Sequence, residues 1–291
     1  MSAEVLLLTK SDYENELRCW LDWHLNIIGF NHVMIFDNES KVDIKSIIAD
    51  YPKGSVDYKY VSGNGKLQQY SLYTEYLKTT KYEWSIALDD DEYLYISKDF
   101  NYSIHSLIDF IQAKFGNEYN KYYILWINMF SKEPISSHSD LYINTHTCYS
   151  YKVCNIIKNL WPEDNGYGKC LINNLVQHIY SQREIYTHIP KSISSNNETI
   201  LVYKDLSDII KVKSHYQNDV ILNPNTNCFI AHFQYKSLND WYTKCSRARV
   251  YGNMLAKKAV YSILYKYQRL FKPLMLLKDR WSEYCKSNKK M

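Results

Sequence analysis

The stretch WSIALDDDEYLYI, residues 84–96, joins a short apolar run to four consecutive acids and then to a second apolar run. Residues 84–88 are typical of a strand that is covered on both faces. Carboxylates repel one another and resist burial, so four of them directly after a core strand need an explanation. Three interpretations stay open from these residues: a solvated acidic turn, a catalytic carboxylate cluster, or a site for a hard divalent cation, Mg2+ or Mn2+.

Outward from this stretch the chain alternates strands and helices. The predicted strands are Val5–Thr9, His32–Phe36, Val56–Val61, Trp84–Leu88 and Tyr122–Ile127, with a further apolar run at Cys228–Phe233. The predicted helices are 12–28, capped by Asp12 and ended by Gly29, then 42–50, 66–80 and 103–115. This alternation predicts an α/β fold with a mostly parallel central sheet flanked by helices. Ligands bind such sheets at the carboxyl ends of the strands, where Asp89 to Glu92 stand.

The C-terminal part of the chain is strongly basic. Residues 244–291 hold 13 Lys and Arg against two acids, which gives a net charge of +11. Because the whole chain has a net charge of +4, residues 1–243 have a net charge of −7. Residues 257–291 interleave basic and apolar side chains, with Pro273 interrupting the helical pattern. This pattern predicts peripheral contact with an anionic membrane surface. The alternatives are a helix packed on the domain with a basic outer face, and a homodimer contact. The acidic remainder argues against nucleic acid as a partner.

Cysteine usage and the N-terminus predict a cytoplasmic protein. The chain has seven Cys, an odd number with no CxxC pair, which favours reduced thiols over a disulfide framework. MSAEVLLLTK contains an apolar run of only four residues, which predicts a first strand and no signal peptide. No apolar run reaches the length of a membrane span. We therefore expect a cytoplasmic location, peripheral on the inner face of the membrane where the tail binds it.

Four separated segments share a pattern with known enzymes. They are NELRCWLDWHLNIIGFNHVMIFDNES (15–40), WSIALDDDEYL (84–94), LWINMF (125–130) with GKCLINN (168–174) and YTHIP (186–190), and IAHFQYKSLNDWYTKCSRAR (230–249). Together and in this order they resemble the glycosyltransferase family 92 group and related family-2-like transferases of surface glycans. Two positions depart from the pattern: Cys19 stands where the family has an acid, and Ser131 where it has glycine.

The resemblance implies a GT-A fold, a Rossmann-like domain that binds a nucleotide sugar, and it assigns roles to the acids. Asp89 and Asp91 are the DxD pair. Asp91 is expected to touch a Mn2+ or Mg2+ ion that bridges the donor diphosphate, and Asp89 to lie near ribose or sugar hydroxyls. Asp90 points to the opposite side if the backbone stays extended. His232 is expected to complete the metal shell, with His188 as its rival and a buried structural histidine as the alternative.

Further residues are expected to bind the donor. The set is Asp37, Lys66, Gln69, Asp89, Lys236, Ser237, Lys244 and Arg247. Lys236 and Ser237 stand at a predicted helix start, which favours anions, and Arg247 could hold a phosphate through two hydrogen bonds. The alternatives are a solvated helix cap at Ser237, a simple Asx-type turn formed by Asn38 and Ser40, and an exposed surface position for Lys66 and Gln69. His24, on an apolar helix face, is expected to be a core histidine with a satisfied hydrogen bond.

The function that the resemblance implies is a metal-dependent, inverting transfer of a sugar from a nucleotide donor to a glycan acceptor. A UDP sugar is the favoured donor, with UDP-galactose as the usual donor of the family. The expected acceptors are lipopolysaccharide, capsule, lipid-linked or glycoprotein glycans. Asp140, Glu163 and Asp164 are the general-base candidates, with an ordinary acidic loop as the alternative for the last two. Residues 1–236 would form the catalytic domain and 237–291 a basic helical extension. A metal-dependent phosphoesterase and a non-catalytic nucleotide- or glycan-binding module are the competing functions.

Overall fold

A computed structural model describes residues 1–63, 65–116, 121–131, 135, 137, 140–149, 168–175, 200–201, 210–211, 228–233, 236–237, 239–240 and 272–288. The chain divides into two compact units. Unit 1 comprises residues 1–126, 166–217 and 225–230, and unit 2 comprises residues 127–165, 218–224 and 231–291. Each unit is described by itself, and the expected boundary between residues 236 and 237 stays a prediction.

The secondary structure follows the predicted alternation. The strands are β1 (Ala3–Thr9), β2 (His32–Asp37), β3 (Val56–Tyr60), β4 (Trp84–Ala87), β5 (Glu92–Ile96), β6 (Lys121–Asn128), β7 (Cys148–Tyr149), β8 (Gly168–Asn173), β9 (Ile200–Leu201), β10 (Ile210–Lys211), β11 (Cys228–His232) and β12 (Lys272–Pro273). The helices are α1 (Glu14–Asp22), α2 (Ile44–Ile48), α3 (Gly65–Leu77), α4 (Ile104–Phe115), α5 (Tyr142–Thr145) and α9 (Leu276–Ser287), with a π-helical turn η1 (Trp23–Ile27) and a 3-10 turn η2 (Lys98–Phe100).

The main sheet has a parallel centre. Its order is β10-β9-β6-β8-β4-β1-β2-β3, and β11 pairs with β5 and β6. β1 is parallel to both β2 and β4, and β2 is parallel to β3, whereas β8 is antiparallel to β4 and β6. Because β2 lies on one side of β1 and β4 on the other, the strand order reverses between β1 and β4. This confirms the predicted α/β fold with a mostly parallel central sheet, and it creates a topological switch point.

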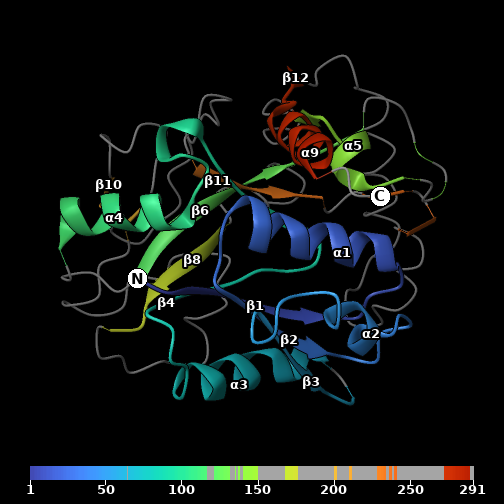
Figure 1. Ribbon diagram of the computed structural model, residues 1–291, viewed down its shortest axis with the longest axis horizontal. Coiled ribbons are helices and arrows are strands. Elements are labelled where there is room, and N and C mark those ends of the chain that lie inside the picture. The colour runs from blue at the N-terminus through green and yellow to red at the C-terminus, as the bar shows by residue number, and fades with distance from the viewer. Residues whose placement is uncertain are drawn as a thin grey trace, which may run out of the picture. The chain divides into compact units, whose positions relative to one another are not determined.

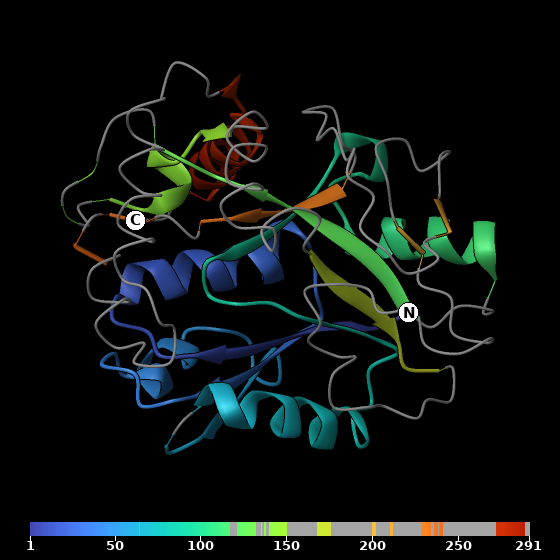
Figure 2. The same ribbon diagram turned by 180° about the vertical axis from the view of Figure 1, so that it is seen from behind.

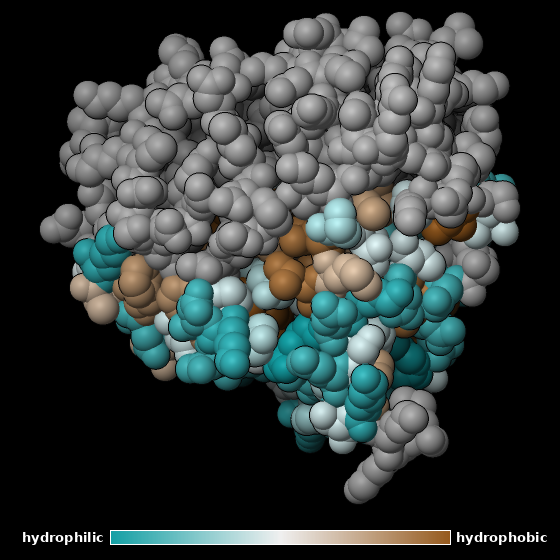
Figure 3. All heavy atoms as spheres, turned by 90° about the horizontal axis from the view of Figure 1, so that it is seen from above, coloured by the Kyte–Doolittle hydropathy of each residue, from teal (hydrophilic) through white to brown (hydrophobic). Residues whose placement is uncertain are grey.

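Helices cover both faces of the β1–β2–β3 part of the sheet. Figures 1 and 2 show α1 on one side of these strands and α3 on the other. Trp20 and Trp23 of α1 and η1, and Tyr73 of α3, are completely buried. The described atoms that are visible in Figure 3 are mostly hydrophilic, with smaller hydrophobic areas between them. The three large aromatic side chains therefore pack these helices on the sheet.

The start of the first helix differs from the prediction. The helix begins at Glu14, Tyr13 is its N-cap residue, and no side chain caps it. Asp12 is not the cap, because its carboxylate instead lies 3.3 Å from the ammonium of Lys41. Its end agrees with the prediction: the helix passes through η1, and Gly29 follows with a φ of +84° that favours glycine.

His24 is the predicted core histidine. It is completely buried, its Nδ1 lies 2.8 Å from the carbonyl oxygen of Trp20, and its Nε2 accepts from the Leu94 N–H at 3.3 Å. Because a carbonyl accepts and an amide donates, the ring carries its proton on Nδ1 and is neutral. Burial lowers the pKa of His24 to about 3, against the smaller opposing effect of the hydrogen bond to Trp20.

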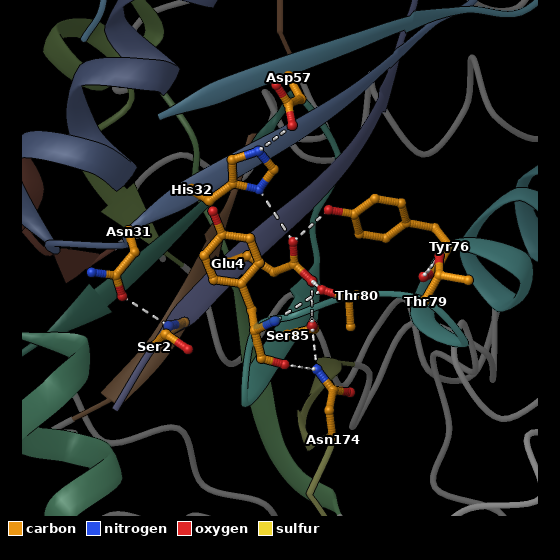
Figure 4. A network of polar contacts seen from close by, with 12 residues as sticks. Ser2, Glu4, Asn31, His32, Asp57, Tyr76, Thr79, Thr80, Ser85 and Asn174 are labelled. Atoms are coloured by element: carbon orange, nitrogen blue, oxygen red, sulfur yellow. Dashed lines mark hydrogen bonds and ion pairs between the residues drawn. The ribbon is translucent and has the colours of Figure 1, made fainter. Parts of the chain in front are cut away.

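A buried carboxylate ties the strands together near their amino ends (Figure 4). Glu4 of β1 has no exposed surface. Its Oε1 accepts from the hydroxyls of Thr80 at 2.6 Å and Ser85 at 2.8 Å. Its Oε2 accepts from the Tyr76 hydroxyl at 2.8 Å and lies 3.2 Å from Nδ1 of His32. Four partners from β2, β4 and the α3 region therefore replace the water that this carboxylate loses on burial.

Unit 2 contains the C-terminal helix. β12 pairs antiparallel with β7, and α9 begins three residues after Pro273, whereas the interruption of a helix at this proline stays a prediction because residues 241–271 lie outside the described part. Leu277 and Trp281 of α9 are buried, and α9 contacts α5. This packing supports the packed-helix alternative for residues 276–287. Among the described residues, none of the helices combines the length and apolar composition that a membrane crossing needs.

Candidate active site

The four acids form a tight turn at the switch point of the sheet. Residues 88–91 connect β4 to β5, and the Glu92 N–H donates to the Asp89 carbonyl at 3.1 Å. The Asp89 N–H donates in turn to Oε2 of Glu92 at 2.9 Å. The backbone is therefore not extended at Asp90, which removes the basis for the predicted opposite orientation of its side chain. Instead, Oδ2 of Asp90 accepts from the Thr9 hydroxyl at 2.7 Å, which joins the ends of β1 and β4.

Trp20 of α1 holds the backbone of this turn. Its indole Nε1 donates to the carbonyl oxygens of Asp89 at 3.1 Å and Glu92 at 2.9 Å. The indole is completely buried, so its N–H needs acceptors within the protein, and the two carbonyls of the turn provide them. α1 thereby fixes the turn from one side of the sheet.

Two of the four acids are buried, and Asp89 and Asp90 are partly exposed. Asp91 is 4% exposed and Glu92 has no exposed surface, so the solvated-turn interpretation is wrong for these two residues. A lysine neutralises part of the cluster: the Nζ of Lys169 lies 3.2 Å from Oδ2 of Asp89 and 3.4 Å from Oε2 of Glu92. Lys169 is itself buried, and its Nζ lies 5.7 Å from the ring centre of Trp126. The cluster therefore carries its own cation.

Burial and neighbouring charge shift the titration of the cluster. Burial raises the pKa of Glu92 well above its usual range; the Lys169 ammonium opposes this, and the charges of Asp89 and Asp91 add to it. Burial alone would lower the pKa of Lys169, but the carboxylates of Asp89 and Glu92 outweigh it and raise this pKa above its usual value. Lys169 is therefore an ammonium ion at neutral pH.

Gln69 and Tyr73 connect α3 to the cluster. Gln69 is 5% exposed, so the exposed-surface alternative is wrong for this residue. Its Nε2 donates to Oδ1 of Asp89 at 3.4 Å and to the Tyr73 hydroxyl at 3.3 Å. The same Tyr73 oxygen accepts from the Leu8 N–H at 2.8 Å. Gln69 thus contacts the acid that the sequence assigned to the donor. Lys66 is the second residue of α3, and its side chain lies outside the described part.

The turn at the end of β2 is held by Asp37 itself, because the Ser40 N–H that an Asx-type turn of Asn38 and Ser40 would use donates to Asp37 instead. Oδ1 of Asp37 accepts from the Ser40 N–H at 2.9 Å, and Oδ2 accepts from the Tyr58 hydroxyl at 3.2 Å. Nδ2 of Asn38 donates to two backbone carbonyls of the segment that follows β3. The side chain of Asp37 therefore shapes the loop beside the switch point, and its contact with a donor stays a prediction.

Oxygen donors at this turn suit a hard divalent cation, but part of the set is already occupied. Oε1 of Glu92 is a buried oxygen without a hydrogen-bond partner. The ammonium of Lys169, however, already forms ion pairs with the carboxylates of Asp89 and Glu92. Across the residues that the structure describes, no group of three or more His, Cys, Asp or Glu is arranged to hold a metal ion. Asp89 and Asp91 thus fit a cation by their chemistry and not as a complete ligand set.

The predicted third metal ligand belongs to the other unit. His232 ends β11, is 6% exposed, and its carbonyl accepts from the Met129 N–H at 2.9 Å. That Asp89, Asp91 and His232 together hold one metal ion stays a prediction. His188 lies outside the described residues.

The remaining predicted residues of unit 2 are placed only in part. Ser237 is buried and caps the following turn, because its hydroxyl accepts from the Asp240 N–H at 3.1 Å; the solvated-cap alternative is wrong. The Nζ of Lys236 lies 4.7 Å from the ring centre of Tyr142. Asp140 is exposed, and its Oδ1 accepts from the Leu141 N–H at 2.7 Å. Glu163, Asp164, Lys244 and Arg247 lie outside the described residues.

Comparison with known proteins gives no family. No family model matches the chain, and no curated protein matches it. Among solved structures, the UDP complex of S. aureus TarS 1–349 is similar at 14% identity and a TM-score of 0.36, over 60% of this chain and 47% of that one. HddC from Yersinia pseudotuberculosis is similar at 13% identity and a TM-score of 0.35, over 86% of this chain and 100% of that one. The chain thus spans about half of the TarS fragment, and likenesses this low assign no activity.

Sequence reasoning missed the residues that hold the acids in place. The sequence pattern includes Lys169 only within GKCLINN and assigns it no role, and it predicts Thr9 only as the end of a strand. A signal for Lys169 exists: it stands beside the apolar run CLI in GKCLIN, and a lysine inside a buried strand needs a charged partner. No comparable signal marks Thr9, whose partner is 81 residues away.

Proposed function

We propose that this chain is a nucleotide-sugar-dependent glycosyltransferase of GT-A type, with a UDP sugar as the favoured donor. The position of the turn formed by the four acids Asp89 to Glu92, the DDDE turn, is the observation that supports this proposal. It follows β4 at the point where the strand order reverses, and Thr9 of β1 is bonded to it. The crevice at such a switch point is where open α/β sheets bind nucleotides. The four sequence segments that resemble glycosyltransferases add the reaction class.

In this proposal the residues of unit 1 bind and orient the donor. Asp89, held by Gln69 and Lys169, accepts from ribose or sugar hydroxyls, and Asp91 binds a Mn2+ or Mg2+ ion. When bound, the metal neutralises the charge that develops on the departing diphosphate. Asp37 contributes to the nucleotide side of the crevice from the end of β2. Trp20 keeps the turn in one conformation, so the carboxylates need little rearrangement when the donor arrives.

The remaining assignments belong to the same proposal. His232, with His188 as the alternative, completes the metal shell, Lys66 lies near the nucleotide, and the diphosphate is bound by Lys236, Ser237, Lys244 and Arg247. Asp140, Glu163 and Asp164 are the candidates for the general base that an inverting transfer needs. The acceptor is a surface glycan, and the basic tail places the enzyme on the inner face of the membrane or forms a homodimer contact.

The experiment that tests the function is a thermal-stability assay with UDP, GDP and CMP, each with and without Mn2+. It compares the wild type with Asp91→Asn, and with Asp99→Asn as a control, because Asp99 is an exposed acid outside the site. A ligand at 100 times its Kd stabilises the native state by about 2.7 kcal/mol, a shift of about 5 °C for a chain of this size. We expect this shift with UDP and Mn2+ in the wild type and the control, and its loss in Asp91→Asn.

A second assay separates the competing functions. Hydrolysis of UDP sugars by the wild type and not by Asp91→Asn supports a transferase, whereas turnover of simple phosphate esters supports the phosphoesterase. UDP binding without turnover of either substrate supports the binding module. The absence of a thermal shift with every nucleotide in the presence of Mn2+ would overturn the assignment of Asp89 and Asp91 to a donor site.

A further inference from the structure

The register of the sheet places Lys169 beside the acids. β8 runs antiparallel to β4, with Ile86 opposite Leu171. Continuing this register puts Lys169 opposite Leu88, one residue before Asp89. The lysine side chain then needs to extend only past the end of β4 to reach the turn. The pairing of two strands, more than 80 residues apart in sequence, therefore sets the distance between the ammonium and the carboxylates.

The ammonium of Lys169 is enclosed by groups that match its charge. Its side chain is 1% exposed, and its Nζ contacts Asp89 and Glu92 at 3.2 and 3.4 Å. The face of the Trp126 ring, 5.7 Å from Nζ to the ring centre, adds a cation–π contact. A lysine so completely buried is stable only when it is paired in this way.

Asp89 is fixed through both of its oxygens. Oδ2 faces Lys169, and Oδ1 accepts from Gln69 at 3.4 Å. The carboxylate plane is therefore set by two donors that come from β8 and α3. Glu92 is held in the same way through Oε2, which accepts from the Asp89 N–H and faces the same ammonium.

We propose that Lys169 is a positioning residue: its ammonium is the resident cation of the DDDE turn, it orients Asp89, and it prevents a divalent cation from binding between Asp89 and Glu92. A metal ion at the site has to bind elsewhere on the cluster. The inference deepens the proposed function and rests on it for the identity of the nucleotide. The occupancy of the place between Asp89 and Glu92 is tested without any nucleotide.

The test measures Mn2+ binding to the nucleotide-free protein by the electron paramagnetic resonance signal of free Mn2+. Lys169→Met removes the ammonium and keeps an unbranched side chain that is one atom shorter, Lys169→Arg keeps a cation, and Lys53→Met is the control at an exposed lysine. We expect Lys169→Met to bind Mn2+ at least tenfold more tightly than the wild type. Lys169→Arg and Lys53→Met are expected to behave like the wild type, and Glu92→Gln added to Lys169→Met is expected to abolish the gain.

A measurement on the wild type covers the case in which Lys169→Met does not fold. Native protein is treated briefly with acetic anhydride, and acetylation is quantified by peptide mass spectrometry. We expect Lys169 to react at least tenfold more slowly than Lys53, and faster in Glu92→Gln than in the wild type. Equal rates at the two lysines, or a folded Lys169→Met protein with no gain in Mn2+ affinity, would overturn the inference.

UDP binding is measured in a separate experiment from Mn2+ binding and acetylation. With UDP and Mn2+, Lys169→Met is expected to bind UDP at least tenfold more weakly than the wild type, and Lys169→Arg to recover part of the affinity. If Lys169 were purely structural, Lys169→Met would lower stability, Lys169→Arg would not recover UDP affinity, and no new Mn2+ site would form. If the wild type fails to bind UDP, the proposed function fails, while the Mn2+ and acetylation results still decide the role of Lys169.

Discussion

The hydroxyl of Thr9 donates to Oδ2 of Asp90 at 2.7 Å, so the last residue of β1 is bonded to the turn that follows β4. These two strands are parallel neighbours, and the strand order reverses between them. The bond therefore crosses the switch point itself, where a nucleotide is expected to bind.

Replacing Thr9 by valine should weaken both the fold and the site. Valine has nearly the same shape but no hydroxyl, so a hydrogen bond to a carboxylate is lost, at a cost of about 1 to 2 kcal/mol in the free energy of unfolding. Urea denaturation measures this cost. Thr9→Ser keeps the hydroxyl and is the control. Equal stability of Thr9→Val and the wild type would show that Asp90 does not depend on this donor.

Trp20→Phe and Trp23→Phe form a matched pair. Each removes a buried indole N–H that donates to backbone carbonyls, Trp20 to Asp89 and Glu92, and Trp23 to Leu94 at 2.7 Å. Both changes should therefore lower stability by about 1 to 3 kcal/mol. Only Trp20→Phe should also reduce the thermal shift given by UDP and Mn2+, because only Trp20 holds the turn. The same loss in Trp23→Phe would point to a general effect of destabilisation.

His24 makes stability depend on pH. Its pKa is about 3 in the folded protein and about 6.5 in an unfolded chain, so both states are neutral above pH 6.5. Below that pH His24 becomes protonated in the unfolded chain but stays neutral in the folded chain. Stability should fall by up to about 1.4 kcal/mol per pH unit as the pH drops from about 6.5 towards 3. His24→Gln should lose this part of the slope, measured by urea denaturation from pH 7 to pH 4. His105→Gln, at a partly exposed position, should keep it.

Glu4→Gln should destabilise the fold, although Glu4 lies near the amino ends of the strands and not at the site. The amide keeps the shape of the side chain, but its NH2 group meets two hydrogen-bond donors where a carboxylate oxygen accepted. We expect a loss of about 2 to 4 kcal/mol in urea denaturation. Glu75→Gln, at an exposed position that pairs with Lys78 at 2.6 Å, should change stability by less than about 0.5 kcal/mol. A loss in Glu4→Gln as small as in this control would contradict the role of the network.

Local pattern predicted much of the fold. The strand at the apolar run 84–88, the existence of the helices before and after it, and Gly29 as a helix stop depend on neighbouring residues, and the structure confirms them. Asp12 failed as a cap because several polar residues near a helix start can cap it, and its carboxylate pairs with Lys41 instead. The π-helical turn at Trp23–Ile27 also escaped prediction, because its apolar pattern is nearly that of an α-helix.

The sequence by itself determined the strand–helix alternation, the end of β4 and the four acids that follow it, since each of these depends on residues close together in the chain. Only the tertiary structure decided how the acids are accommodated. Strand pairing brings Lys169 and Thr9 to them from about 80 residues away, and helix packing brings Trp20 and Gln69. The period of a strand tells which of its side chains share a face but not which strand lies beside it. The partners of a buried charge therefore cannot be read from its own neighbourhood.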